Sequence, residues 1–396
     1  MKLHPLQGHE AARGAVAGAF ARDRLPQALL LHGRPGVGKQ RFALWTGQLL
    51  LCGEPGPDGP CDSCQGCRLA ARVEHPDLHW YFPLKRPSSR GSRERDDEAL
   101  EDARTARIEE LRSRPLQPTW SDEPQGLHLG TVRNLRRRVG SGPSMGRRQV
   151  FVIARAEELV AQESSPEAAN ALLKILEEPP ASTWLILTSN EPGRLLPTIR
   201  SRTSAMHLPP LPQERVADFL ERERGAEAKD AQRIARIAAG SIGLALGYLP
   251  EEGTDDAKEP RDGPLERLRK DAFRLLRDSV SPHAARQFMR ALEYRPVGGR
   301  GLQELLVALE VWIRDLAAVA AGSPDQVLNR DAAEWLGDTV RDRRIHARDA
   351  ARALAAVEEA REAAAGNANP QLVVAGLLLD LRQTLAPSSP RPSPTP

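Results

Sequence analysis

A chain of 396 residues is long enough for two or three domains. Its composition, 40% hydrophobic and 28% charged, is that of a globular protein with a sizeable core. No apolar run approaches the roughly 18 residues of a membrane-spanning helix, and the N-terminal segment lacks the apolar centre of a secretory signal, so we expect a cytoplasmic protein. The net charge of +3 neither favours nor excludes nucleic acid, and a DNA contact would need a local basic patch.

A glycine-rich stretch, HGRPGVGKQR, follows the first predicted strand (residues 25–31) and precedes a helix predicted from Arg41 to Leu51. Strand, glycine loop and helix are the context of a phosphate-binding loop with the pattern G-x-x-x-x-G-K-[ST]. Gln40 stands where a hydroxyl would hold Mg²⁺, so ATP hydrolysis is not expected, while ATP binding stays open because backbone amides can still hold phosphate. The candidate nucleotide-binding residues are Gly33, Gly36, Gly38 and Lys39.

The predicted strand QVFVIA, from Gln149 to Ala154, is a second test of ATPase chemistry. An active enzyme of this kind needs an acidic pair at the strand end, to hold Mg²⁺ and to activate water. Here Ala154 and Arg155 occupy those positions, and neither side chain can perform these tasks. Glu157 and Glu158 come later and are expected to face solvent. Two independent defects therefore argue against ATP hydrolysis.

All the cysteines of the chain lie within sixteen residues, in the spacing Cys52-x8-Cys61-x2-Cys64-x2-Cys67. Four thiolates suit the tetrahedral coordination of Zn²⁺, and a site filled by four protein ligands is structural rather than catalytic. An iron–sulfur cluster and free buried thiols are the alternatives. His75 and His79 are expected to lie outside the cluster.

Further helices and strands alternate after this cluster. The polar insertion 84–125 is expected to be helical over Glu98 to Arg112 and otherwise mobile. A helix is predicted from Ala168 to Glu178 and ends at two prolines, and a buried strand from Trp184 to Asn190. This alternation predicts an α/β fold with a mostly parallel sheet covered on both faces.

A basic helix from Val132 to Val139 carries a dense positive patch. It is either a solvated helix face or a contact for DNA phosphates. The patch, called here the arginine patch, consists of Arg133, Arg136, Arg137, Arg138, Arg147 and Arg148.

The rest of the chain is predicted to be helical. A linker at Pro209 to Gln213 precedes a small helical unit over Glu214 to Leu246, and a charged linker follows over residues 251–264. Leu265 to Leu385 is helical almost throughout, and the Pro- and Ser-rich tail 388–396 is expected to be disordered.

Several of these stretches together resemble the delta-prime family of the bacterial DNA polymerase III clamp loader. The resemblance rests on RLPQALLLHGRPGVGK, the four-cysteine insertion, ANALLKILEEPP, LTSNEPGRLLPTIRSRT and NANPQLVVAGLLLDL. It implies an AAA+ P-loop module over 1–208 with a zinc module at 52–67, a helical lid over 209–250, a linker over 251–264 and an all-α collar domain over 265–387.

The family resemblance also implies a function. The protein would be a non-catalytic stator in a hetero-pentamer with motor and clamp-opening subunits, part of the DNA polymerase III holoenzyme, that loads a sliding clamp onto primer–template DNA. In motor subunits the lid supplies an arginine where this chain has Gly243. Ser201-Arg202-Thr203 matches a Ser-Arg-Cys stretch whose arginine enters a neighbour's ATP site, so Arg202 is the candidate catalytic residue, acting in trans.

Alternatives remain for the arginine and for the whole protein. Arg202 is otherwise a surface or salt-bridged residue, and nearby Arg200 competes for the assignment. The protein is otherwise an active motor subunit of the same loader, or a solitary zinc- and DNA-binding protein. A nucleoside monophosphate kinase is rejected because no matching lid chemistry is present.

Overall fold

The computed structural model describes residues 3–86, 93–116, 125–159, 167–251, 261–281, 298–366 and 368–385. They form two compact units. The N-terminal unit contains the described residues of 1–119, 125–219 and 238–246, and the C-terminal unit those of 220–237 and 247–396. No helix within these described ranges is long and apolar enough to cross a membrane.

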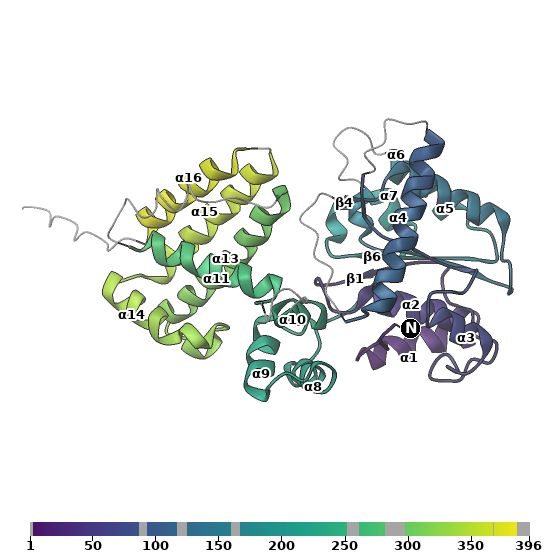
Figure 1. Ribbon diagram of the computed structural model, residues 1–396, viewed down its shortest axis with the longest axis horizontal. Helices are drawn as coiled ribbons and strands as arrows, with labels where there is room; N and C mark the ends of the chain where they lie inside the picture. Colours follow the sequence, from purple (N-terminus) through teal and green to yellow (C-terminus); the bar gives the residue numbers. More distant parts are fainter. Residues whose placement is uncertain are drawn as a thin grey trace, which may run out of the picture. The chain divides into compact units, whose positions relative to one another are not determined.

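A five-stranded parallel sheet organises the N-terminal unit (Figure 1), in the order β2-β5-β6-β1-β7. Its mostly parallel character, predicted from the sequence, is confirmed. The sequence patterns do not predict the two edge strands, β2 and β7. The strands are β1 (Ala28–His32), β2 (Leu78–Tyr81), β5 (Gln149–Ile153), β6 (Thr183–Ser189) and β7 (Ser204–His207).

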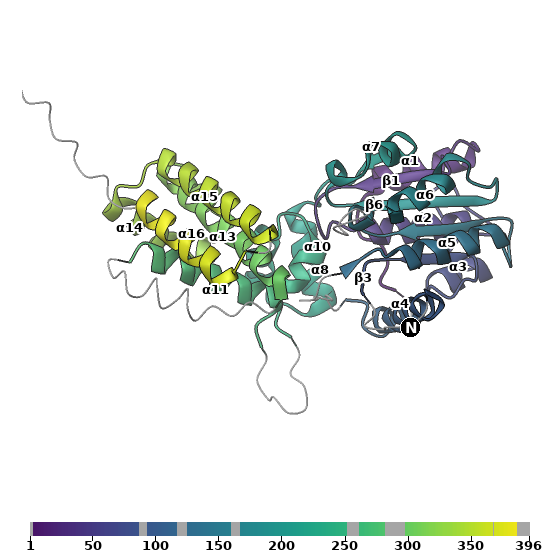
Figure 2. The same ribbon diagram turned by 90° about the horizontal axis from the view of Figure 1, so that it is seen from above.

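Two apolar layers cover the faces of this sheet, because successive strand residues point to opposite faces. Leu29 and Leu31 of β1 pack into a core with α1, α2 and α4. Ala28 and Leu30 pack into a second core with α5, α6 and α7. The predicted coverage of both faces is therefore confirmed: in Figure 1, α6 and α7 lie on one side of β1 and β6, and α1 and α2 lie on the other. Figure 2 shows the same elements from above. The helices are α1 (Glu10–Ala21), α2 (Lys39–Leu50), α3 (Gln65–Ala70), α4 (Arg93–Ser113), α5 (Leu129–Ser141), α6 (Glu167–Glu177) and α7 (Pro197–Ser201).

The polar insertion contributes helix α4, which begins five residues before the predicted start at Glu98. Its Leu100 and Ile108 are buried in the first core. A short antiparallel pair, β3 (Leu84–Lys85) with β4 (Gln125–Gly126), joins the ends of the insertion. Residues 87–92 and 117–124, for which mobility is expected, lie outside the described residues.

The arginine patch, which lies on α5 and directly before β5, is divided between internal contacts and solvent. Arg133 binds Asp97 and Arg138 binds Glu101, so both tie α5 to α4. Arg148 lies over the rings of Phe20 and Trp184. Arg136, Arg137 and Arg147 are exposed. Only these last three present their charge mainly to solvent, which reduces the patch available to a polyanion.

The C-terminal unit is built from helices around a core that includes the fully buried Trp312. The Trp312 indole donates a hydrogen bond to the Arg269 carbonyl at 3.0 Å. In the NANP stretch, Asn369 caps α16 by accepting from the Gln371 and Leu372 amides, and Pro370 occupies the first turn. Its main helices are α9 (Ala228–Ile237), α11 (Pro264–Ser279), α13 (Gly298–Ala320), α14 (Ala333–Arg343), α15 (Ala347–Ala365) and α16 (Pro370–Thr384).

Two shorter helices lie on segments shared by the units, α8 (Gln213–Arg224) and α10 (Ile242–Tyr248). The predicted linker 251–264 is described only at its ends, where Glu251 and Arg261 form an isolated bridge. The tail 388–396 lies outside the described residues.

Candidate functional site

The glycine loop connects the end of β1 to the first residue of α2, Lys39. A Cβ atom on Gly33 would lie 2.4 Å from the Leu208 carbonyl oxygen, so this position requires glycine. Lys39 is only 6% exposed, and its Nζ donates to the carbonyls of Gly33 at 2.7 Å and Arg34 at 2.6 Å. The lysine therefore binds its own loop. Burial lowers the pKa of Lys39 to about 8, and the Glu157 charge opposes this shift.

The tip of the loop bonds directly to the start of α10. Gly243 N–H donates to the Gly36 carbonyl at 2.9 Å, and the buried Ser241 hydroxyl donates to the Pro35 carbonyl at 2.8 Å. A Cβ on Gly243 would lie 2.7 Å from Gly36 Cα. Any larger residue at 243 therefore requires the loop or α10 to shift. We call these contacts the loop–α10 closure.

Glu157 contradicts its predicted exposure to solvent: it is buried, with 2% of its surface exposed. The chain reverses directly after β5, where Arg155 has a left-handed φ of 52°, and turns Glu157 inward. One carboxylate oxygen accepts from the Asn190 amide at 3.0 Å. The other is buried with no hydrogen-bond partner among the described residues. The nearby apolar residues Ala156 and Leu159 were the sequence feature that could have indicated this burial.

Arg202 lies at the C-terminal end of α7, where its side chain is 36% exposed. Its Nη2 forms an ion pair with Glu177 Oε1 at 2.9 Å, and its Nη1 donates to the Thr198 carbonyl at 3.2 Å. The salt-bridged state considered from the sequence is thus present. Arg200 is exposed and forms no ion pair within the described ranges.

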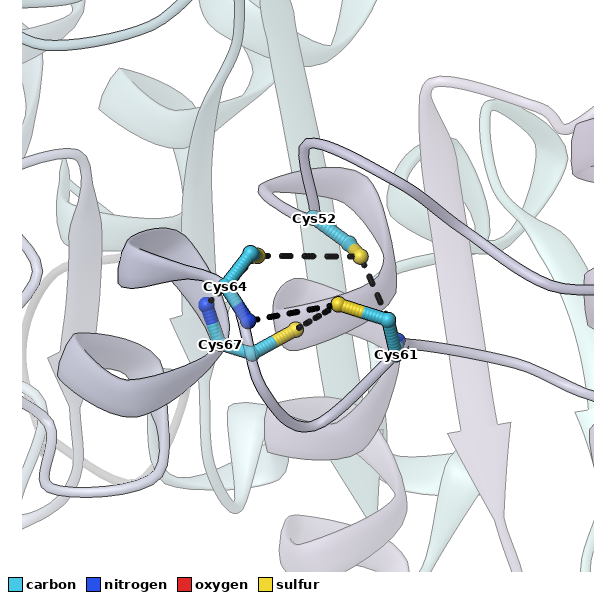
Figure 3. A group of neighbouring side chains, drawn as sticks. All are labelled: Cys52, Cys61, Cys64 and Cys67. Carbon is cyan, nitrogen blue, oxygen red and sulfur yellow. Dashed lines mark hydrogen bonds between the residues drawn. The ribbon is translucent and has the colours of Figure 1, made fainter.

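The four cysteines gather in one cluster, although they come from the end of α2, a Pro- and Gly-rich loop and α3 (Figure 3). All four Sγ atoms lie within 4.8 Å of one another. The Cys61–Cys67 and Cys52–Cys64 sulfur pairs are 3.9 Å apart. Zinc–sulfur bonds of about 2.3 Å in a tetrahedron place sulfurs about 3.8 Å apart, so the cluster fits Zn²⁺.

Backbone N–H groups surround the cluster, as is typical of a thiolate metal site. Cys61 N–H donates to Cys52 Sγ at 3.3 Å, and Cys67 N–H donates to Cys64 Sγ at 3.4 Å. The amide of Cys64, with the hydroxyl and amide of Ser63, lowers the pKa of the Cys61 thiol to about 6. Burial instead raises the pKa of Cys67. A cation would favour the thiolate form of all four residues.

His79 lies on the edge strand β2 and outside the cysteine cluster, and is only 8% exposed. Burial, with Arg138 and Arg104 nearby, lowers the pKa of His79 to about 4. The unfolded chain therefore binds a proton near pH 6.5, and the folded chain does not until about pH 4. The contribution of neutral His79 to the free energy of unfolding is fully present above the unfolded pKa. It decreases as the pH falls from about 6.5 to about 4, by up to about 1.4 kcal/mol per pH unit.

We therefore expect His79→Gln to flatten the decrease in the free energy of unfolding between pH 6.5 and pH 4. Urea unfolding at a series of pH values measures this, with His4→Gln as the control. An unchanged pH dependence in His79→Gln would contradict the prediction.

A family model and several curated relatives connect this chain to subunits of DNA polymerase III. The profile described as "DNA polymerase III, delta subunit" matches residues 8–212. DNA polymerase III subunit delta' of Escherichia coli is 29% identical over 59% of this chain and 58% of its own length. The Pseudomonas aeruginosa subunit delta' is 32% identical over 60% of each chain. The chain thus spans less than two thirds of these two relatives.

A third relative extends the sequence similarity along most of the chain. The Bacillus subtilis subunit delta' is 25% identical over 92% of this chain and 93% of its own length. A Thermotoga maritima gamma subunit-related protein aligns with 93% of this chain and 99% of its own at 14% identity, with a TM-score of 0.35. The profile match covers more than half of the chain, and on this basis the chain belongs to the DNA polymerase III delta-subunit family, alongside the subunits named delta'.

Proposed function

We propose that this protein is a non-catalytic stator subunit of the replicative clamp loader, with an AAA+ core over 1–208, a lid over 209–250 and a collar over 265–387. The loop–α10 closure carries the proposal. In a nucleotide-dependent module the nucleotide bridges the loop and the lid, whereas here Gly36 and Gly243 bond to each other directly. Lys39 is turned onto its own loop. Gln40 and Arg155 also support the proposal, because neither side chain can bind Mg²⁺ or activate the attacking water.

Two groups of residues would face partners in the assembly. Leu372 and Leu379 lie seven residues apart on α16 and are 71% and 55% exposed, so they share one helix face that a neighbouring collar helix would cover. Arg136, Arg137 and Arg147 would contact phosphates of primer–template DNA. Co-purification with motor and clamp-opening subunits, and its loss in Leu372→Glu, tests the assembly.

Catalysis would occur at a neighbouring subunit. Arg202 would enter the ATP site of a motor subunit and stabilise the charge that develops on the transferred phosphoryl group. Zn²⁺ held by Cys52, Cys61, Cys64 and Cys67 would have only a structural task, because all four coordination positions are filled by protein.

We expect no ATP turnover above background by the purified chain with Mg²⁺ and primed DNA. The physical reason is that Gln40 lacks the hydroxyl, and Ala154 and Arg155 lack the carboxylates, that would hold Mg²⁺ and activate water at such a loop. Phosphate release measures it, and Lys39→Ala is the control that removes the loop cation. Turnover that disappears in Lys39→Ala would make this chain a motor subunit and end the stator proposal.

The buried Glu157 is the observation that favours the second candidate, an active motor subunit. One of its carboxylate oxygens has no partner among the described residues, and the carboxylate charge raises the pKa of Lys39 against the effect of burial. If the chain does hydrolyse ATP, Glu157→Gln decides the origin of that activity. A loss equal to that of Lys39→Ala would assign the carboxylate a direct role, and unchanged turnover would exclude one.

A further inference from the structure

Within the proposed trans-acting role of Arg202, on which this inference rests, we propose that Glu177 is a positioning residue. It would hold the Arg202 guanidinium in the orientation in which it meets the neighbour's γ-phosphate. The contact joins two stretches that are far apart in the sequence, the end of α6 and the end of α7. Glu177 would act through Arg202 and would not itself touch the nucleotide.

The hydrogen bonds of Arg202 fix its guanidinium from two sides. Nη2 is paired with Glu177 at 2.9 Å, and Nη1 donates to the Thr198 carbonyl at 3.2 Å and the Ser201 hydroxyl at 3.4 Å. A guanidinium has five N–H donors in one rigid plane. These contacts leave the Nε–H and one N–H of Nη2 for phosphate oxygens. The side chain is therefore oriented and still able to bind a second anion.

Stabilisation of α6 does not explain the position of Glu177. The helix ends there because Pro179 and Pro180 follow, and its C-terminus carries the negative end of the helix dipole. A carboxylate at this end is electrostatically unfavourable for the helix itself. An exposed ion pair also adds little to folding stability. Its main effect is to restrict the rotamers of a long side chain, and orientation of this kind contributes to catalysis.

The neighbouring residues supply matched controls. Glu178 follows Glu177 directly, carries the same charge and is exposed, but makes no ion pair in the part of the chain described. Arg200 is the corresponding control for Arg202, because it carries the same charge two residues away and is exposed. Substitution of each control changes the local charge equally and leaves the Glu177–Arg202 contact in place. Effects of general electrostatics are thereby separated from effects of the contact.

The experiment is steady-state ATP turnover by the full loader, reconstituted with its motor and clamp-opening subunits, sliding clamp and primed DNA. We expect Glu177→Gln to lower kcat about threefold with the KM for ATP unchanged, because an oriented donor is lost but binding is not. Glu178→Gln should match the unmodified loader. The double variant Glu177→Gln/Arg202→Ala should be no slower than Arg202→Ala alone.

The outcomes separate this inference from the function on which it rests. If Arg202→Ala is as active as Arg200→Ala, the trans-acting arginine itself is wrong. If Arg202→Ala is impaired but Glu177→Gln behaves like Glu178→Gln, or accelerates turnover, only the positioning role is overturned. A lower Tm of the isolated Glu177→Gln chain with a proportional loss of assembled loader would assign Glu177 to folding and also overturn it.

Discussion

Arg202→Ala in the reconstituted loader is expected to cut ATP turnover at the adjoining motor site by about 10³-fold, the scale of arginine fingers elsewhere. The side chain is exposed, so the isolated chain should keep its stability. Single-turnover hydrolysis resolves this site from the others. Arg202→Lys keeps the charge but loses the planar donor geometry, so it should restore only part of the rate.

Arg200→Ala is the control for this experiment, because Arg200 lies two residues away on the same short helix and is exposed. Full activity in Arg200→Ala with a large loss in Arg202→Ala would settle which arginine acts. The reverse result would transfer the role to Arg200, and equal activity in both variants would remove the trans-acting arginine from the mechanism.

Cys67→Ser should give the largest loss of stability in the N-terminal unit. Cys67 is fully buried and lies on α3, which packs against α2. Structural zinc contributes on the order of 10 kcal/mol to the folding of small metal modules, and removal of one thiolate forfeits much of it. Metal content and thermal unfolding measure the effect. Ser63→Ala is the control, because it removes a hydrogen bond to Cys61 Sγ but leaves all four thiolates in place.

The metal analysis also decides between the alternatives left open by the sequence. One zinc ion per chain in the unmodified protein, absent from Cys67→Ser, would support the proposed site. Iron with visible absorption would indicate an iron–sulfur cluster. A metal-free unmodified protein with normal thermal stability would contradict the structural metal centre.

The sheet was predictable where its strands are buried on both faces. The runs over β1, β5 and β6 are continuously apolar, as parallel central strands are. Strand β2 contains His79 between buried neighbours, and β7 is exposed along most of its length, so neither carries that pattern. Their pairing depends on backbone hydrogen bonds to strands distant in the sequence.

The residues of the candidate site could be predicted from the sequence, but the loop–α10 closure could not. The spacing of the cysteines indicated their convergence. The two Cys-x-x-Cys spacings share Cys64 and need only local turns, and the Pro- and Gly-rich stretch before Cys61 lets the chain return to Cys52. The burial of Glu157 depends on a single left-handed residue, Arg155, and no propensity favours arginine in that conformation. The bond from Gly243 to Gly36 joins residues that are 207 positions apart. From the sequence, Gly243 indicates only the absence of the arginine that the family resemblance leads us to expect in the lid.

The mutual contact of Gly36 and Gly243 has an evolutionary consequence. An arginine introduced at position 243 would meet the loop backbone, because even a Cβ there lies 2.7 Å from Gly36 Cα. The loop would have to move before the arginine could be tolerated. Under the proposed stator role, the arginine would also have no catalytic task while Gln40, Ala154 and Arg155 remain. On that proposal, each of these substitutions made alone would be neutral or harmful. Stepwise substitution from this sequence would therefore not yield an ATP-hydrolysing subunit, because the loop–α10 closure would first have to open.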